Sequence, residues 1–345
     1  MPRFCATAGK MNHLRRRVAM KTKFLGLVFV LVVFGLSSCK KEATPEAPQR
    51  LVIAVIPKGT THEFWKSVHQ GAEQAGAELG VEVIWKGPLK EDDREAQIKV
   101  VEDFITRKVD GIALAPLDDT ALRVPVRSAK QSGIAVVIFD SALKSEDQVS
   151  FVATDNYQGG RLGGKYLAEL LQGKGKVILL RYQEGSASTR DREQGFLEAM
   201  SQRPEITVVS SNQYGGATTE TAYQASENLL APLKNPDGSL GIDGIFCPNE
   251  STTFGMLRAL QDSGFAGKVK FVGFDSSAKL VQALKAGEIQ GLVLQNPGKM
   301  GYLAVKTLIA HLQGKPVEKR IDTGVVLATL QNLDQPDIKA LLGAP

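Results

Sequence analysis

The polar residues of this 345-residue chain that are best suited to chemistry follow five apolar runs. They carry imidazole, hydroxyl, carboxylate and amide groups, which donate and accept hydrogen bonds and so suit the binding of a small polar ligand. No GxSxG sequence or triad-like arrangement accompanies them. The five segments are Thr60-Thr61-His62, Asp140-Ser141, Asn249-Glu250, Asp275-Ser276 and Gln295-Asn296.

The elements that must position these segments alternate between strand and helix patterns, and the alternation restarts after Gly173. Continuous apolar strands between amphipathic helices indicate parallel sheets covered on both faces. The sequence therefore predicts an α/β fold of two Rossmann-like, doubly wound lobes, with ligands bound beyond the carboxyl ends of the strands. The predicted strands are Leu51–Ile56, Val81–Trp85, Gly111–Ala115, Ala135–Phe139 and Ser150–Ala153, then Lys176–Leu180, Ile206–Ser210, Gly244–Cys247, Lys270–Phe274 and Gln290–Leu294. Predicted helices include Glu63–Leu79, Arg94–Arg107, Gly159–Leu171 and Gln295–Leu312.

Two motifs typical of enzymes are incomplete. Residues 159–166 approximate a phosphate-binding loop but end in Tyr166, which is too long to place its hydroxyl on magnesium. The glycines of that segment are better explained by close helix packing. A zinc helix that starts at His62 would need a second histidine where Lys66 stands. We therefore expect no metal, no cofactor and no enzymatic activity.

The excess of positive over negative charge in the chain comes from its first residues. The formal net charge is +5, but residues 1–39 hold seven of the 42 basic side chains and no acidic one. The remainder therefore carries 35 basic against 37 acidic groups. Nucleic-acid binding needs a cationic face, so we expect no nucleic-acid partner.

The first 39 residues are predicted to be a lipoprotein signal peptide. A cationic stretch precedes about thirteen apolar residues, 24–36, which is too short to span a bilayer but typical of a signal-peptide core. The run ends in Leu36-Ser37-Ser38-Cys39, which resembles a bacterial lipobox, so Cys39 is the predicted lipidation site. Residues 40–49 then form a polar tether. The folded part keeps one cysteine, Cys247, in an apolar strand pattern that predicts a buried, inert thiol.

Residues 51–330 resemble the periplasmic sugar-binding proteins of the ribose- and galactose-binding type. That family has two Rossmann-like lobes joined by a three-strand hinge, with the sugar held in the cleft between them. The order and spacing of several short segments carry the resemblance. These segments are His62-Glu63-Phe64-Trp65, Ile138-Phe139-Asp140, Ala153-Thr154-Asp155-Asn156, Arg190-Asp191-Arg192, Asn249-Glu250, Val272-Gly273-Phe274-Asp275 and Gly291-Leu292-Val293-Leu294-Gln295.

The resemblance implies a set of ligand-binding residues. Phe64 and Trp65 match the aromatic rings that stack on a sugar, and Asp140 matches an acceptor of sugar hydroxyls. Arg192 matches a donor on the second lobe. Other readings stay open from the residues alone: core packing for the two aromatics, a surface ion pair with Asp191 for Arg192, and helix capping for the remaining polar residues. Those remaining matches are Asn249, Asp275 and Gln295.

Several positions depart from the ribose-binding pattern. Ser141 stands where that pattern has an arginine, while Ala115 and His62 each replace an asparagine. His62 is a candidate hydroxyl partner or a solvated residue at a helix start. Tyr214 lies about three residues from the expected second-lobe aromatic. We therefore expect a ligand other than ribose bound in the usual way.

The family's chain path gives domain boundaries for this sequence. The first lobe is expected to comprise residues 50–154 and 296–322, and the second lobe residues 155–295 and 323–345. The expected function is that of a monomeric, lipid-anchored, periplasmic or cell-surface receptor that delivers a monosaccharide or polyol to the permease and ATPase of an ABC importer. A ligand-sensing module for a membrane receptor kinase or chemoreceptor is the alternative, and neighbouring genes would distinguish the two.

The lipobox generates a direct prediction. Cys39→Ala removes the thiol to which the lipid would be attached, so the precursor should stay unprocessed at this site and unlipidated while the lobes fold unchanged. Metabolic labelling with a tagged fatty acid measures the outcome, and Cys247→Ala is the matched control that should keep the label. Label that persists in Cys39→Ala would show that the anchor lies elsewhere.

Overall fold

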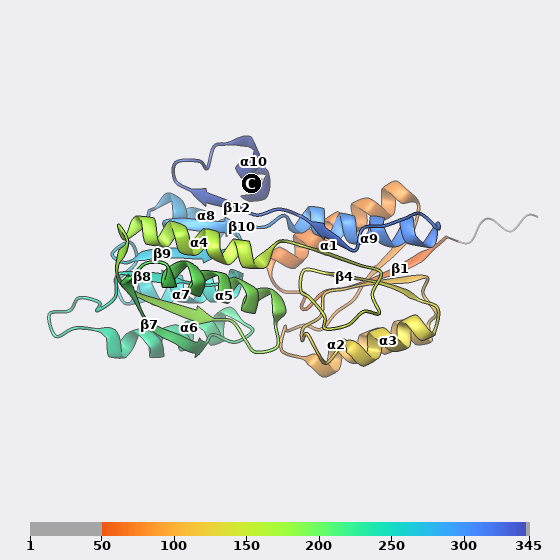
Figure 1. Cartoon of the computed structure of the whole chain (residues 1–345), viewed down its shortest axis with the longest axis horizontal. Helices are drawn as coiled ribbons and strands as arrows, with labels where there is room; N and C mark the ends of the chain where they lie inside the picture. Colours follow the sequence, from red (N-terminus) through yellow and green to blue (C-terminus); the bar gives the residue numbers. More distant parts are fainter. Residues whose placement is uncertain (1–49, 343–345) are drawn as a thin grey trace, which may run out of the picture. The chain divides into compact units, whose positions relative to one another are not determined.

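The computed structural model describes residues 50–342, and two six-stranded sheets organise them (Figure 1). The strand order is β11-β5-β4-β3-β1-β2 in one sheet and β12-β10-β9-β8-β6-β7 in the other. Helices cover both faces of each sheet, which confirms the predicted α/β fold of two doubly wound lobes. The predicted signal peptide, Cys39 and the tether lie outside the described residues.

The first lobe has two cores because successive residues of a strand point to opposite faces of the sheet. Ile53 and Val55 pack against α1 and α9, whereas Ala54 and Ile56 pack beneath α2 and α3. Helix α9 comes late in the sequence but lies beside α1 (Figure 1). The elements are β1 (Val52–Ile56), α1 (Glu63–Leu79), β2 (Glu82–Trp85), α2 (Arg94–Thr106), β3 (Gly111–Leu114), α3 (Arg123–Gln131), β4 (Ala135–Phe139), β5 (Ser150–Ala153), α9 (Pro297–Leu312) and β11 (Arg320–Asp322).

The second lobe repeats this plan. Helices α4 and α5 cover one face over a core that includes Phe196 and Phe246, whose rings stack 4.5 Å apart. Helices α6, α7, α8 and α10 cover the other face, where Cys247 is fully buried as predicted. The elements are α4 (Asn156–Leu170), β6 (Lys174–Arg181), α5 (Ala187–Ser201), β7 (Glu205–Tyr214), α6 (Thr219–Leu230), the 3-10 turn η1 (Ala231–Leu233), β8 (Gly244–Phe246), α7 (Glu250–Asp262), β9 (Lys270–Phe274), α8 (Ala278–Lys285), β10 (Gly291–Leu294), β12 (Val326–Thr329) and α10 (Pro336–Leu342).

The edge strands are where the sequence-based prediction is incomplete. Strands β11 and β12 were not predicted, and β12 pairs antiparallel with β10 in a sheet that is otherwise parallel. Strand β11 has the sequence Arg-Ile-Asp and so holds a single apolar residue, which gives no strand pattern. Strand β12, Val-Leu-Ala-Thr, is apolar but was not assigned as a strand. Strand β7 extends to Tyr214, whereas the prediction ended it at Ser210. The prediction missed its last residues because they are polar and largely exposed at the sheet edge.

The chain runs from one sheet to the other at three places. Strand β5 leads into α4, β10 leads into α9, and β11 leads into β12. Two of these segments are tied together by hydrogen bonds. The Thr154 and Thr323 hydroxyls lie 3.2 Å apart, and Asp322 Oδ1 accepts from the backbone N–H groups of Asp155 and Gly324 at 3.2 and 3.0 Å. Hydrogen bonds therefore hold the segment at Thr154 and the segment at Thr323 side by side.

The glycines of the incomplete phosphate-loop motif lie inside α4, a regular helix rather than a loop. A Cβ atom on Gly160 would lie 1.9 Å from the backbone oxygen of Arg192 in α5, and one on Gly195 would lie 2.1 Å from the backbone oxygen of Tyr157. Glycine is thus required for the two helices to approach this closely. The contact fixes the backbone of Arg192, one of the predicted ligand-binding residues.

Candidate ligand-binding site

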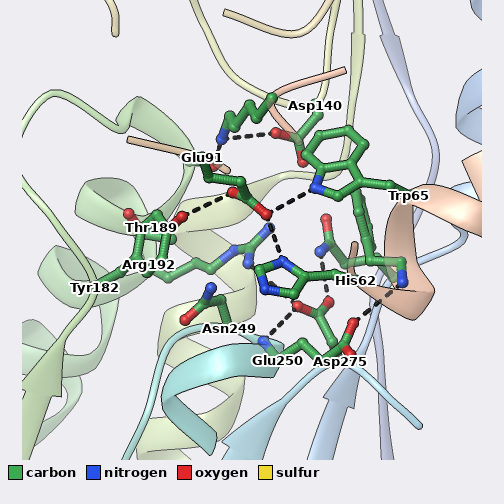
Figure 2. Close-up of a pocket in the computed structure, with 14 residues that line it drawn as sticks. His62, Trp65, Glu91, Asp140, Tyr182, Thr189, Arg192, Asn249, Glu250 and Asp275 are labelled. Atoms are coloured by element: carbon green, nitrogen blue, oxygen red, sulfur yellow. Dashed lines mark hydrogen bonds and ion pairs between the residues drawn. The ribbon is translucent and has the colours of Figure 1, made fainter. Parts of the chain in front are cut away.

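All eight residues predicted to bind the ligand line a single pocket between the two sheets (Figure 2). The first lobe contributes His62, Phe64, Trp65 and Asp140, and the second contributes Arg192, Asn249, Asp275 and Gln295. Six further side chains complete the lining. They are Lys58, Glu91, Tyr182, Ser188, Thr189 and Glu250.

Two aspartates occupy equivalent places in the lobes. Asp140 follows β4 and Asp275 follows β9, and each of these strands lies fourth from one edge of its sheet. Both residues have left-handed backbone angles, with φ of 61° and 69°, a conformation that aspartate tolerates better than most residues. The turn at each strand end brings one carboxylate from each lobe into the pocket.

A lysine pairs with the first-lobe aspartate. Lys58 follows β1, and its Nζ lies 2.8 Å from Asp140 Oδ2, with only 4% of either side chain exposed. The contact is an ion pair without the alignment of a hydrogen bond, so Oδ2 accepts no hydrogen bond from the described residues. Lys58 Nζ also donates across the cleft to Ser188 Oγ at 3.0 Å. Lys58 therefore gives the first lobe a cation in the pocket, although Ser141 stands where the ribose-binding pattern has an arginine.

The guanidinium of Arg192 is held on several sides. Nε donates to Asn156 Oδ1 at 2.8 Å, Nη1 donates to the Pro248 carbonyl at 2.9 Å, and the group lies 4.0 Å from the centre of the Phe274 ring. Asp275 Oδ2 is 4.0 Å away and provides the opposite charge. The side chain is 97% buried, so the alternative of a surface pair with Asp191 is wrong.

The remaining second-lobe residues divide between binding and capping. Asp275 Oδ1 accepts from Gln295 Nε2 at 2.7 Å, and its Oδ2 accepts from the N–H of Glu250, the first residue of α7, at 3.0 Å, so Asp275 does not cap α8, the helix that follows it. Ser277 caps α8 instead. Asn249 does cap α7, since its Oδ1 accepts from Thr252, and it also lines the pocket. Gln295 Oε1 accepts no hydrogen bond from the described residues.

Aromatic rings form one wall. Phe64 and Trp65 meet edge to face with ring centres 4.9 Å apart, and both also belong to the first-lobe core. The second-lobe aromatic is Tyr182, which is 1% exposed, while Tyr214 is 42% exposed and does not line the pocket. Tyr182, which directly follows β6, is thus the second-lobe aromatic residue of the pocket that was expected near Tyr214.

Glu91 is the acceptor for three pocket side chains. Its Oε1 lies 2.5 Å from His62 Nδ1 and accepts from Trp65 Nε1 at 2.7 Å, and its Oε2 accepts from the Tyr182 hydroxyl at 2.8 Å (Figure 2). Burial opposes charge on both members of the ion pair. The attraction between the two charges nevertheless outweighs the effect of burial. It raises the pKa of His62 to about 9 and lowers the pKa of Glu91 to about 2.

Glu250 links the lobes at the opposite wall. Its carboxylate accepts from the backbone N–H of Phe64 at 3.1 Å and approaches that of Glu63 at 3.4 Å, both in the first turn of α1. The N-terminus of a helix attracts negative charge. Burial still raises the pKa of Glu250 to about 7, although His62 and these N–H groups act to lower it.

Six lining residues were not predicted to bind the ligand. Ser188 and Thr189 lie in the first turn of α5, and Glu250 begins α7 directly after the predicted Asn249. Lys58 and Tyr182 come directly after strands or within two residues of them, so the rule that predicted Asp140 and Asp275 also applies to them. Glu91 lies in the loop before α2, six residues beyond β2. No spacing in the sequence indicates that this loop reaches the pocket.

The His62–Glu91 pair predicts a pH dependence of stability. The His62 pKa is about 9 in the folded protein against 6.5 for an ordinary histidine. The stabilisation is therefore complete below pH 6.5 and lost as the pH rises through 9, by up to about 3 kcal/mol. Denaturant unfolding at pH 6 to 10 measures it. His62→Gln should remove this fall and His69→Gln should keep it; an identical pH profile in wild type and His62→Gln would contradict the assignment.

Residues 50–342 contain no group of histidine, cysteine, aspartate and glutamate side chains that could hold a metal ion. Across the same residues no helix combines the length and apolar character needed to cross a bilayer.

Comparison with known proteins identifies the family. A family model described as a periplasmic binding protein domain matches residues 53–316. The D-allose-binding periplasmic protein of Escherichia coli K12 is 30% identical over 277 residues, which cover 77% of this chain and 87% of the relative.

Two solved structures are similar throughout the folded part. A carbohydrate transporter solute binding protein from Agrobacterium radiobacter, in complex with D-arabinose, has a TM-score of 0.81 and 34% identity, covering 86% of this chain and all of that one. An ABC transporter solute binding protein from Agrobacterium vitis with bound D-fucose has a TM-score of 0.79 and 36% identity, and the match covers 85% of this chain and all of that one. The chain therefore belongs to the periplasmic binding protein family of the ribose- and galactose-binding type, whose members are non-enzymatic solute receptors of ABC importers.

Proposed function

We propose that this protein is a lipid-anchored receptor that binds a monosaccharide or related polyol between its lobes and delivers it to the permease and ATPase of an ABC importer. The observation that carries the proposal is the convergence of Asp140 and Asp275, one carboxylate from each lobe, on one pocket. Carboxylates accept from sugar hydroxyls, Arg192 and Lys58 donate to them, and the rings of Phe64 and Trp65 suit the apolar C–H faces.

The charges of the pocket favour a neutral ligand. Lys58 lies against Asp140, His62 against Glu91, and Arg192 near Asp275, so each cation already has an anion as its partner. A ligand phosphate or carboxylate would have to compete with these side chains for the cations. Hydroxyl groups can instead bridge between a donor and an acceptor of the same pair.

Binding and closure constitute the proposed mechanism. In the described conformation the lobes touch directly, through Lys58 and Ser188, Glu91 and Tyr182, and Glu250 and Phe64. A ligand that contacts both lobes stabilises the closed state relative to the open one. The connecting segments near Thr154, Gln295 and Thr323 are the proposed hinge, with residues 50–154 and 296–322 on one side.

The cellular setting follows from the family and from the N-terminal sequence. The family implies a periplasmic location. Cys39 is the proposed site of the lipid that would hold the receptor at a bacterial membrane, with residues 40–49 as a tether. The similar proteins are described with D-allose, D-arabinose and D-fucose, so these three sugars are the first to test as ligands.

A thermal-shift screen of pentoses, hexoses and sugar alcohols identifies the ligand. A ligand at a hundredfold excess over its Kd stabilises a protein by about 2.7 kcal/mol, which a melting curve detects readily. We expect at least one neutral sugar to raise the melting temperature. A purine or an amino acid that does so while no sugar does would refute the sugar assignment.

The two aspartates provide the mutational test. Asp140→Ala and Asp275→Ala each remove charge-assisted hydrogen bonds to the ligand, so the Kd should rise about ten- to a hundredfold. Calorimetric titration with the sugar from the screen measures the Kd, and Asp334→Ala, whose side chain is 96% exposed, is the control with unchanged affinity. Lowered melting temperatures with unchanged affinity in both variants would move the binding site elsewhere.

A further inference from the structure

Glu91 accepts hydrogen bonds from three other pocket side chains, although it does not follow a strand end as Asp140 and Asp275 do. It is 6% exposed and comes from the loop between β2 and α2. Its carboxylate gathers His62 and Trp65 from its own lobe and Tyr182 from the other. Its backbone oxygen accepts from Gln183 Nε2 at 2.7 Å, again across the cleft. One residue thus holds two contacts within the first lobe and two between lobes.

We propose that Glu91 is a positioning residue that holds the His62 and Trp65 side chains in the binding wall and joins that wall to Tyr182 when the lobes close. The inference rests on the proposed function for the role of the wall, but not for the contacts themselves. Because the bonds to His62 and Trp65 lie within one lobe, they persist when the lobes separate. The bonds from Tyr182 and Gln183 can form only in the closed state.

The chemistry of the three donors explains why a carboxylate stands here. An imidazole N–H, an indole N–H and a phenol O–H converge on two oxygens, and an ionised carboxylate is an acceptor at every lone pair. A buried charge is tolerated only with such partners. The stem of the side chain is also fixed, since a Cβ atom on Gly59 would lie 2.8 Å from Glu91 Cγ. The loop therefore presents the carboxylate in one place.

The indole of Trp65 reports on this arrangement without any ligand. The chain has two tryptophans, Trp65 and Trp85, so a Trp85→Phe background leaves Trp65 as the only fluorophore of its kind. In that background, Glu91→Ala should raise acrylamide quenching of Trp65 at least twofold. Tyr182→Phe should leave the quenching unchanged in the ligand-free protein. Glu95→Ala, at an exposed glutamate of α2 with an 88% exposed side chain, is the matched control.

A conservative variant separates positioning from a general loss of structure. Glu91→Gln retains one acceptor oxygen for the Trp65 N–H, so it should restore low quenching, whereas it removes the charge that stabilises protonated His62. Histidine NMR titration should then show the His62 pKa falling from about 9 toward 6.5. Wild-type quenching in Glu91→Ala, or an unchanged His62 titration in Glu91→Gln, would overturn the proposal.

Ligand dissociation tests the contact between lobes. With the sugar from the screen, stopped-flow release should be about ten- to a hundredfold faster in Tyr182→Phe and in Glu91→Ala. The double variant should release no faster than Glu91→Ala alone, because both changes remove the same bond. Additive effects would overturn the closure role. If no sugar binds the wild type, the proposed function fails, while the quenching and titration still decide whether Glu91 positions the wall.

Discussion

Burial of charge between the two lobes is the constraint on which the rest of the site depends. Five side chains in the pocket that carry a formal charge are more than nine-tenths buried: Lys58, Glu91, Asp140, Arg192 and Asp275. Removing such groups from water is costly unless each has a partner of opposite charge and hydrogen bonds for its remaining atoms. The partners come from different strands, loops and lobes. The fold must therefore bring the strand ends of two sheets together before any of these side chains is satisfied.

This constraint also connects recognition to motion. Several partners face each other across the cleft, so the closed state satisfies groups that the open state leaves to water. A hydroxyl-rich ligand replaces that water with donors and acceptors on both sides, whereas an apolar ligand would leave the buried charges without partners. Closure is thus favoured by ligands that, like the water they displace, both donate and accept hydrogen bonds. The bonds among Thr154, Thr323 and Asp322 keep the connecting segments together.

Much of the fold follows from the sequence because the buried strands are continuous apolar runs. Strands β4, β5 and β9 were predicted with their observed bounds, and the rule that ligands lie beyond strand ends led directly to Asp140 and Asp275. The exceptions have physical reasons. Short edge strands such as β11 carry no apolar run, and Glu91 reaches the pocket only through the path of its loop. Tyr182 follows its strand directly and could have been predicted by the same rule.

The central claim is that a small ligand draws the two lobes together around this pocket. Small-angle X-ray scattering on the protein, with and without the sugar found by thermal shift, measures this most directly. We expect a smaller radius of gyration at saturating ligand, because contacts such as those of Lys58 with Ser188 form only in the closed state. An identical radius of gyration with and without saturating ligand would contradict it.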